Sequence, residues 1–143
     1  MLGKALMRRW SGDDVTGFGS AQADIRSPDQ VDKVVSESNP EWIVLSAAYT
    51  DVDGCEINPT LAAAVNTQGA VNVAKAAANS RAKLLFVSTD YVFDGKSNTP
   101  YEANDPRRPI NAYGKSKADA EQKIQALLPD ACIAGSTCSL PAF

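Results

Sequence analysis

Short apolar runs alternate with helix-like stretches along most of this chain. Trp42–Leu45 and Leu84–Val87 are apolar and contain β-branched residues, which is typical of buried strands. The stretches that begin at Ser27, at Asn58 and at Tyr113 have the spacing of amphipathic helices. Strands that alternate with helices pair in parallel, and the helices then cover the sheet. The pattern therefore predicts an α/β fold: a parallel sheet with helices on both faces.

Local signals indicate where several of these elements begin and end. Leu2, Ala5 and Leu6 share one helical face, so we expect a helix from the first residues. The run Ser27–Gln30 reads Ser-Pro-Asp-Gln, a helix start with a Ser cap, Pro at the first position and Gln three residues after the cap. Asn39-Pro40 ends that helix. The helix that opens at Asn58-Pro59 is expected to continue to about Asn79, and the one from Tyr113 to about Leu128.

One glycine pair resembles a nucleotide-binding fingerprint without meeting its requirements. We expect a short strand over Asp14–Phe18, and the glycine pair lies at its end, in Gly17-Phe18-Gly19. The third glycine is absent, and the next helix begins only at Ser27, so we interpret the pair as a turn after a strand. Beyond it, no acid or arginine marks a choice between NAD and NADP.

The composition excludes several classes of site. The chain has 143 residues, no histidine and a net charge of -3, which rules out Ser-His-Asp catalysis and His-based metal sites and argues against a nucleic-acid or anionic-membrane partner. Cys55, Cys132 and Cys138 form no C-x-x-C motif, so we expect neither a disulfide framework nor a metal site. No apolar run has the length of a membrane span, and we expect a cytoplasmic protein.

A Tyr, a Lys and a Thr are positioned for acid–base chemistry. Tyr113 and Lys117 are one helical turn apart, and Thr89 follows the strand that ends near Val87. A neighbouring ammonium lowers the pKa of a phenol, so we expect Lys117 to prepare Tyr113 for proton transfer. Thr89 is expected to hold the same substrate oxygen. A carbonyl held in this way is ready for a hydride that no side chain supplies, which implies a nicotinamide cofactor. Tyr-x-x-x-Lys is also common in ordinary amphipathic helices.

Four longer motifs carry a family resemblance. The stretches SAAYTDVDGCE from Ser46, VNTQGAVNVAKAA from Val65, VSTDYVFDG from Val87 and PYEANDPRRPINAYGKSKADAE from Pro100 resemble the dTDP-4-dehydrorhamnose reductases, which are extended short-chain dehydrogenase/reductases. The resemblance covers nearly the whole chain and is strongest from Trp42 to Glu121. It implies a Rossmann-like, doubly wound sheet. It also implies reduction of a 4-keto dTDP-sugar by NADPH or NADH, and a homodimer in the complete protein.

The resemblance also implies roles for individual residues. Thr89, Tyr113 and Lys117 would be the catalytic set, and Lys117 would also bind the nicotinamide ribose. Leu2 and Gly3, at the start of the chain, would contact the cofactor. Asp24 and Ile25 would lie beside its adenine. The strand-end segment that lines the cofactor would consist of Ala47, Ala48 and Tyr49. Val52, Thr89 and Tyr91 would face the sugar nucleotide, although Tyr91 equally fits a half-buried structural aromatic. Asn66 is expected to bond a neighbouring backbone instead of a ligand.

The two ends of the chain depart from the family pattern. Gly3 matches the last glycine of the family's glycine-rich loop, so we expect residues 1–143 to be an incomplete NAD(P)-binding domain without the first strand and the C-terminal substrate-binding part. Near the other end, Cys138 stands where the family has a Trp. We therefore expect this chain alone to bind NADPH weakly, because most of the pyrophosphate-binding turn is missing.

Two other readings of the motifs stay open. The regulatory subunit of methionine adenosyltransferase has a similar fold and similar motifs but no catalytic role. A reductase or epimerase of another nucleotide sugar would also carry them. The stretch AAYTDVDGCE from Ala47 favours the reductase.

Overall fold

The computed structural model describes residues 2–136. Helices and strands alternate through most of the chain, and the order is α1 Leu2–Arg9, α2 Pro28–Ser38, β1 Trp42–Leu45, α3 Val52–Ile57, α4 Pro59–Ala62, the π-helical segment η1 Ala63–Gly69, α5 Ala70–Ser80, β2 Lys83–Thr89, the 3-10 turn η2 Asp90–Val92, α6 Ala112–Leu127 and β3 Cys132–Ser136. Cys138 and its neighbours, where the sequence departs from the family, lie outside the described residues.

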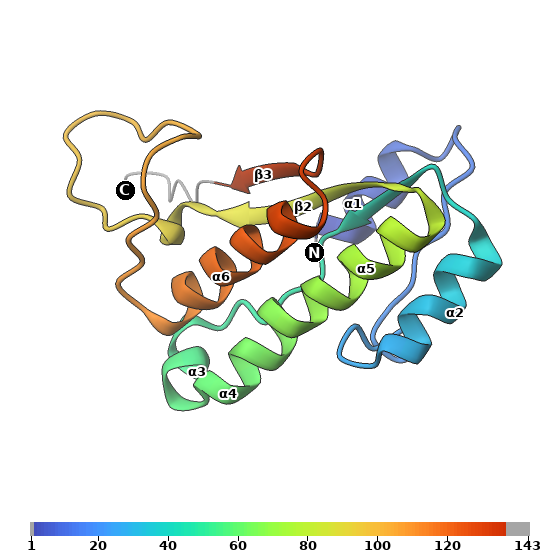
Figure 1. Cartoon of the computed structure of the whole chain (residues 1–143), viewed down its shortest axis with the longest axis horizontal. Helices are drawn as coiled ribbons and strands as arrows, with labels where there is room; N and C mark the ends of the chain where they lie inside the picture. The colour runs from blue at the N-terminus through green and yellow to red at the C-terminus, as the bar shows by residue number, and fades with distance from the viewer. Residues whose placement is uncertain (1, 137–143) are drawn as a thin grey trace.

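The three strands form one parallel sheet in the order β1-β2-β3. Ile43 of β1 is paired with Leu84 of β2, and Phe86 of β2 is paired with Ile133 of β3. The predicted parallel sheet is confirmed. Its third strand was not predicted, because the segment Cys132–Ser136 contains only one strongly apolar, β-branched residue. All three carboxyl ends lie at the same edge of the sheet (Figure 1).

A layer of helices covers one face of the sheet. In Figure 1, α2, α5 and α6 lie side by side below the strands, whereas α1 overlaps the strands in this view. The core between sheet and helices is built from small and branched side chains: Val31, Val35, Leu45, Ala70, Val73, Ala74, Ala76, Ala77, Ala82, Leu84, Phe86, Ala120 and Ile124. Leu85 and Val87 point to the opposite face and are half-buried, and no α1 side chain among the described residues is buried. The described helices therefore cover one face more completely than the other.

The long helical stretch after Asn58 is continuous but not uniform. Asn58 caps it by accepting a hydrogen bond from the backbone N–H of Leu61 at 3.0 Å. The helix then runs through α4, widens to the π-helical segment Ala63–Gly69 and continues as α5. A π-helical turn shifts the register of the side chains that follow it. Here it places the polar side chains of Asn66 and Thr67 inside the protein.

Helix α2 begins and ends as predicted, with one difference in its cap. Pro28 occupies the first turn, and Asn39 closes the helix in the left-handed conformation with φ 42°. The side chain of Ser27 makes no capping hydrogen bond, and Gln30 accepts instead from the backbone N–H of Asp24 at 2.9 Å. The predicted helix start is confirmed, but the Gln30 side chain binds the backbone of the preceding segment instead of the capping residue.

One local prediction failed, and one short helix was not predicted. Asp14–Phe18 is not a strand, because no neighbouring strand pairs with it. The turn predicted at Gly17-Phe18-Gly19 is displaced: these residues have no regular structure, and a turn follows over residues 20–22, where the Gly19 carbonyl accepts from the N–H groups of Gln22 and Ala23 at 2.9 Å. Helix α3 was missed because six residues are too few to show a period. Asp51 starts it by accepting from the N–H of Gly54.

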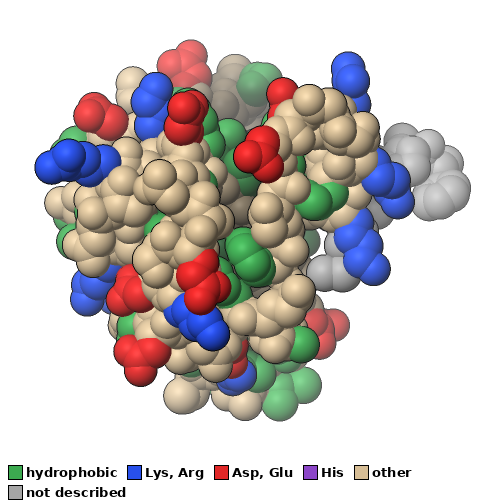
Figure 2. Space-filling model, turned by 90° about the vertical axis from the view of Figure 1, so that its right-hand side faces the viewer, with side chains coloured by type: hydrophobic (Ala, Val, Ile, Leu, Met, Phe, Trp, Pro, Cys, Tyr) green, Lys and Arg blue, Asp and Glu red, His purple; other side chains and the backbone are tan. Residues whose placement is uncertain are grey.

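The surface mixes charges of both signs. Figure 2 shows acidic and basic side chains interspersed over one face of the molecule. Within residues 2–136, no helix is both long and apolar enough to cross a bilayer.

Candidate active site

The predicted catalytic residues meet at the carboxyl end of β2. Thr89 is the last residue of β2, and Tyr113 lies in the first turn of α6. The Thr89 side chain is near enough to the Tyr113 phenol to act on its pKa, and its hydroxyl donates to the Asp90 carboxylate at 3.2 Å. The close approach of α6 depends on Gly114, since a Cβ there would lie 2.1 Å from the carbonyl oxygen of Tyr91. Asn111 caps the helix by accepting from the Gly114 N–H at 2.7 Å.

Tyr113 lies in an apolar pocket, not in a charged one. Its side chain is buried, and it packs with Cys55 and Ala62, against which Tyr49 and Val52 also lie. Burial raises the pKa of Tyr113, and the Thr89 side chain opposes that rise. The lowered pKa expected from the spacing to Lys117 is therefore wrong. The phenol therefore keeps its proton at neutral pH and can serve as a proton donor, as a weaker acid than a free tyrosine.

Tyr91 forms one wall beside the phenol. The rings of Tyr91 and Tyr113 meet edge to face, with centroids 5.7 Å apart and planes 70° apart. Tyr91 remains 38% exposed, and the Tyr91 N–H donates to the Thr89 hydroxyl oxygen at 3.3 Å. This arrangement fits both readings of Tyr91, a structural aromatic and a surface for a ligand.

Lys117 turns toward the sheet. Its Nζ donates to the carbonyl oxygen of Val87 at 2.6 Å and lies 3.9 Å from the centre of the Phe86 ring. The residue is 2% exposed. Burial lowers the pKa of Lys117 to about 8, while the negative charge of Glu121 works in the opposite direction. The ammonium is thus hydrogen-bonded to β2. It is not one of the groups that shift the pKa of Tyr113.

The segment after β1 is held by the π-helical turn. Asn66 is 2% exposed, and its side chain bonds both backbone polar atoms of Tyr49, as predicted for a residue that serves the backbone. The Asn66 Nδ2 also donates to the hydroxyl of Ser116 on α6 at 3.0 Å. These bonds fix Ala47 and Ala48 at the carboxyl end of β1, with Ala47 exposed and Ala48 half-buried. Small side chains there leave the backbone open to a ligand.

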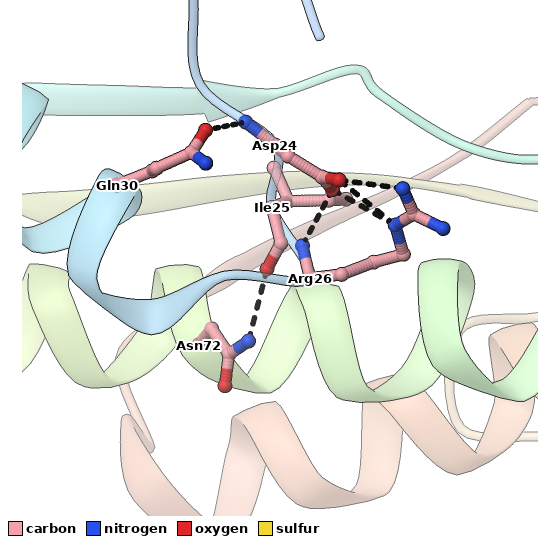
Figure 3. Close-up of polar contacts among 5 residues, drawn as sticks. All are labelled: Asp24, Ile25, Arg26, Gln30 and Asn72. Carbon is pink, nitrogen blue, oxygen red and sulfur yellow. Dashed lines mark hydrogen bonds and ion pairs between the residues drawn. The ribbon is translucent and has the colours of Figure 1, made fainter.

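Asp24 and Ile25 lie in the segment before α2 and are held against α5, which continues the helix that carries Asn66 (Figure 3). The Asn72 Nδ2 donates to the Ile25 carbonyl at 2.9 Å, and the Gln30 side chain accepts from the Asp24 N–H. Asp24 forms an ion pair with Arg26 at 2.6 Å. The side-chain hydrogen bond from Arg26 lowers the pKa of Asp24 to about 2. Both carboxylate oxygens of Asp24 are engaged by Arg26.

The start of α1 reaches the same edge of the sheet. A Cβ added to Gly3 would lie 3.1 Å from the Ser46 hydroxyl, so Gly3 is next to the residue that follows β1. Leu2 beside it is 48% exposed.

Ile25 packs directly on the π-helical segment, because a Cβ at Gly69 would lie 2.7 Å from the Ile25 side chain.

Sequence reasoning missed a polar group behind the site. Glu121, Arg107 and Ser88 are linked there by side-chain hydrogen bonds. The only sequence signal was the position of Glu121, one helical turn after Lys117.

The parallel sheet, the helical layer and the grouping of Thr, Tyr and Lys at one strand end define a Rossmann-like α/β protein. A family model described as the RmlD substrate binding domain matches residues 1–136, and the chain belongs to that family. This confirms the resemblance that the sequence motifs carry.

Individual relatives agree with this assignment. The chain is 39% identical over 126 residues to dTDP-4-dehydrorhamnose reductase of Mycobacterium tuberculosis strain H37Rv, covering 85% of this chain and 41% of the relative. It is 37% identical over 136 residues to a probable dTDP-4,6-dihydroxy-2-methyloxan-3-one 4-ketoreductase of Streptomyces antibioticus, covering 93% of this chain and 46% of that protein. The chain spans less than half the length of these relatives.

A solved structure gives the same result. The crystal structure of dTDP-4-dehydrorhamnose reductase from Bacillus anthracis in complex with NADP matches with a TM-score of 0.91 and 38% identity. The match covers 95% of this chain and 49% of that chain.

Proposed function

We propose that this chain forms the cofactor-binding half of an NAD(P)H-dependent reductase of a 4-keto nucleotide sugar, converting dTDP-4-dehydro-L-rhamnose to dTDP-L-rhamnose. The observation that carries the proposal is that Thr89, at the carboxyl end of β2, and Tyr113, in the first turn of α6, lie beside each other. Ligands of parallel α/β sheets bind beyond this edge. Relatives named as reductases of dTDP-sugars support the substrate class.

In this proposal each side chain has a separate task. The Thr89 hydroxyl holds the substrate's carbonyl oxygen beside Tyr113. Tyr113, which is protonated at neutral pH, gives its proton to that oxygen as the carbonyl becomes an alcohol. A reduced nicotinamide, when bound, supplies the hydride that adds to the carbonyl carbon. Hydride and proton together account for the two hydrogens that the sugar gains.

The residues at this edge of the sheet fit a nicotinamide cofactor. Leu2 and Gly3 lie next to the end of β1, where the small side chains of Ala47 and Ala48 leave the backbone open. Tyr49 follows them, held by Asn66. Asp24 and Ile25 would bound the adenine end, fixed by Gln30 and Asn72.

Lys117 would serve the ribose of the cofactor. Its ammonium has three hydrogens, and one of them is donated to the Val87 carbonyl. The same set of residues suits NADPH and NADH.

The sugar nucleotide would lie on the Tyr113 side. Val52 packs in the apolar cluster around Tyr113, and the Tyr91 ring meets the Tyr113 ring edge to face. Both therefore border the point at which the proton is delivered. The homodimer expected for the complete protein and its cytoplasmic location stay predictions.

A chimaera tests the proposal. Residues 1–136 would replace the matching region of the Bacillus anthracis reductase, and NADPH consumption would be measured with dTDP-4-dehydro-L-rhamnose. We expect substrate-dependent oxidation of NADPH. A folded chimaera that binds NADPH but leaves this sugar unchanged, while reducing a different 4-keto dTDP-sugar, would favour the Streptomyces antibioticus type of activity. Binding without turnover of any such sugar would favour a non-catalytic regulatory subunit.

A further inference from the structure

A buried carboxylate lies directly behind the candidate site. Glu121 on α6 is 4% exposed. One of its oxygens accepts from the hydroxyl of Ser88, and the other accepts from the Arg107 Nε at 2.9 Å. Ser88 immediately precedes Thr89 in β2. A single side chain of α6 therefore binds both the catalytic strand end and a residue of the following loop.

Arg107 extends this link into the loop between η2 and α6. Its terminal NH1 group donates to the carbonyl of Ala103 at 2.7 Å and to that of Asp105 at 2.9 Å. The guanidinium also lies 5.5 Å from the centre of the Phe93 ring. An arginine with this many partners holds the loop backbone as well as the carboxylate.

The same carboxylate acts on the catalytic lysine. Glu121 lies one helical turn after Lys117, and its charge favours the ammonium form against the effect of burial. It is the one ionisable group of the described chain whose charge shifts the pKa of Lys117. The ammonium also contacts the Val87 carbonyl and the Phe86 ring, which do not titrate.

We propose that Glu121 is a positioning residue of this site. Its carboxylate fastens the end of β2 through Ser88 and the 93–110 loop through Arg107, and it keeps Lys117 charged from one helical turn away. A buried carboxylate is costly unless it is paired, and both oxygens of Glu121 are paired, one with β2 and one with the loop. The role of Lys117 in this statement rests on the proposed function, whereas the mechanical link does not.

Conservative variants of the 143-residue chain test the link. Glu121→Gln keeps the shape of the side chain and removes its charge. Asp119→Asn is the matched control, since it removes an exposed charge from the same helix. The Arg108 N–H donates to the Val92 carbonyl, so its hydrogen exchange reports whether the loop is fastened. We expect exchange at Arg108 to accelerate by roughly tenfold or more in Glu121→Gln, as for loss of a charge-assisted hydrogen bond.

A second readout follows the Lys117 ammonium by NMR, with the signal assigned by its loss in Lys117→Met. We expect its titration midpoint, near 8 in the parent chain, to fall by roughly one pH unit in Glu121→Gln and to stay in place in Asp119→Asn. Where Glu121→Gln does not fold, Arg107→Met removes the arginine that binds Glu121. This variant should accelerate hydrogen exchange at Arg108 and leave the Lys117 midpoint in place. Unchanged exchange at Arg108 or an unchanged Lys117 midpoint in a folded Glu121→Gln chain would overturn the proposal.

Neither readout requires a cofactor. A chain that shows both effects, together with a folded chimaera that reduces no 4-keto dTDP-sugar, would refute the proposed function and leave the positioning role intact. A chain that shows neither effect, together with a chimaera that reduces the sugar, would overturn the positioning role and leave the proposed function intact.

Discussion

The side chain of Asn66 is hydrogen-bonded to both backbone polar atoms of Tyr49. Its Oδ1 accepts from the Tyr49 N–H at 2.7 Å, and its Nδ2 donates to the Tyr49 carbonyl at 3.0 Å. The amide thereby imitates a neighbouring strand for the segment that leaves β1. Because the same Nδ2 reaches Ser116, the end of β1 and the helix that carries Tyr113 are joined through one side chain.

Asn66→Ala should therefore destabilise the protein. The change leaves buried groups of Tyr49 without their partner, and we expect the free energy of unfolding to fall by about 2–3 kcal/mol. Urea denaturation measures it. Asn79→Ala, at an exposed position of the same helix, should change it by less than about 0.5 kcal/mol. Equal losses in the two variants would contradict the role of Asn66.

Gly114→Ala should separate α6 from the end of β2. The new Cβ would lie 2.1 Å from the Tyr91 carbonyl oxygen, and a backbone atom cannot move aside as a flexible side chain does. We expect a loss of about 1–3 kcal/mol in the free energy of unfolding, as for other overpacked sites. Gly12→Ala, with nothing within 4 Å of the added atom, is the control. A Gly114→Ala protein as stable as the control would show that α6 does not approach so closely.

Tyr113→Phe should abolish most turnover in the chimaera while leaving its fold intact. Removing the proton donor is expected to lower the turnover number by about 10²-fold or more. Tyr101→Phe removes a hydroxyl that bonds Asp94, outside the site, and should retain activity. Steady-state NADPH oxidation compares the two, and near-normal turnover in Tyr113→Phe would remove Tyr113 from the mechanism.

The buried Lys117 should make stability depend on pH in the alkaline range. Its pKa is about 8 in the folded chain, against 10.5 for an ordinary lysine. Between these values the unfolded chain holds the proton and the folded chain does not, so the contribution of Lys117 to stability rises with pH. Over that window the gain is on the order of 3 kcal/mol.

Urea denaturation of the parent and of Lys117→Met at pH 8 and pH 10.5 measures this contribution as a difference. Burial raises the pKa values of Tyr113 and Cys55, which lowers stability at high pH, but both residues are present in both proteins and their contributions cancel. Lys115→Met, at an exposed position, should show no such trend. The free energy of unfolding of the parent, minus that of Lys117→Met, should increase from pH 8 to pH 10.5. A value that stays constant or decreases would contradict the burial of the ammonium.

Elements with strong local signals could be read from the sequence. Proline after a polar cap marks the start of α2, and an apolar, β-branched run marks β1, because these preferences depend on a few neighbouring residues. The one-turn spacing of Tyr113 and Lys117 is equally local, since it follows from helix geometry alone. The order of strand and helix was then sufficient to predict parallel pairing and to place Thr89 at the sheet edge.

Long-range packing decided the rest. The Lys117 ammonium bonds the Val87 carbonyl, 30 positions away, and Tyr113 is enclosed by Cys55 and Ala62 from another part of the chain. The sign of the pKa shift of Tyr113 depends on that burial, because desolvation outweighs its other influences, and no spacing within one helix contains this information. The link from Glu121 to Ser88 and Arg107 likewise exists only once β2, the loop and α6 have met.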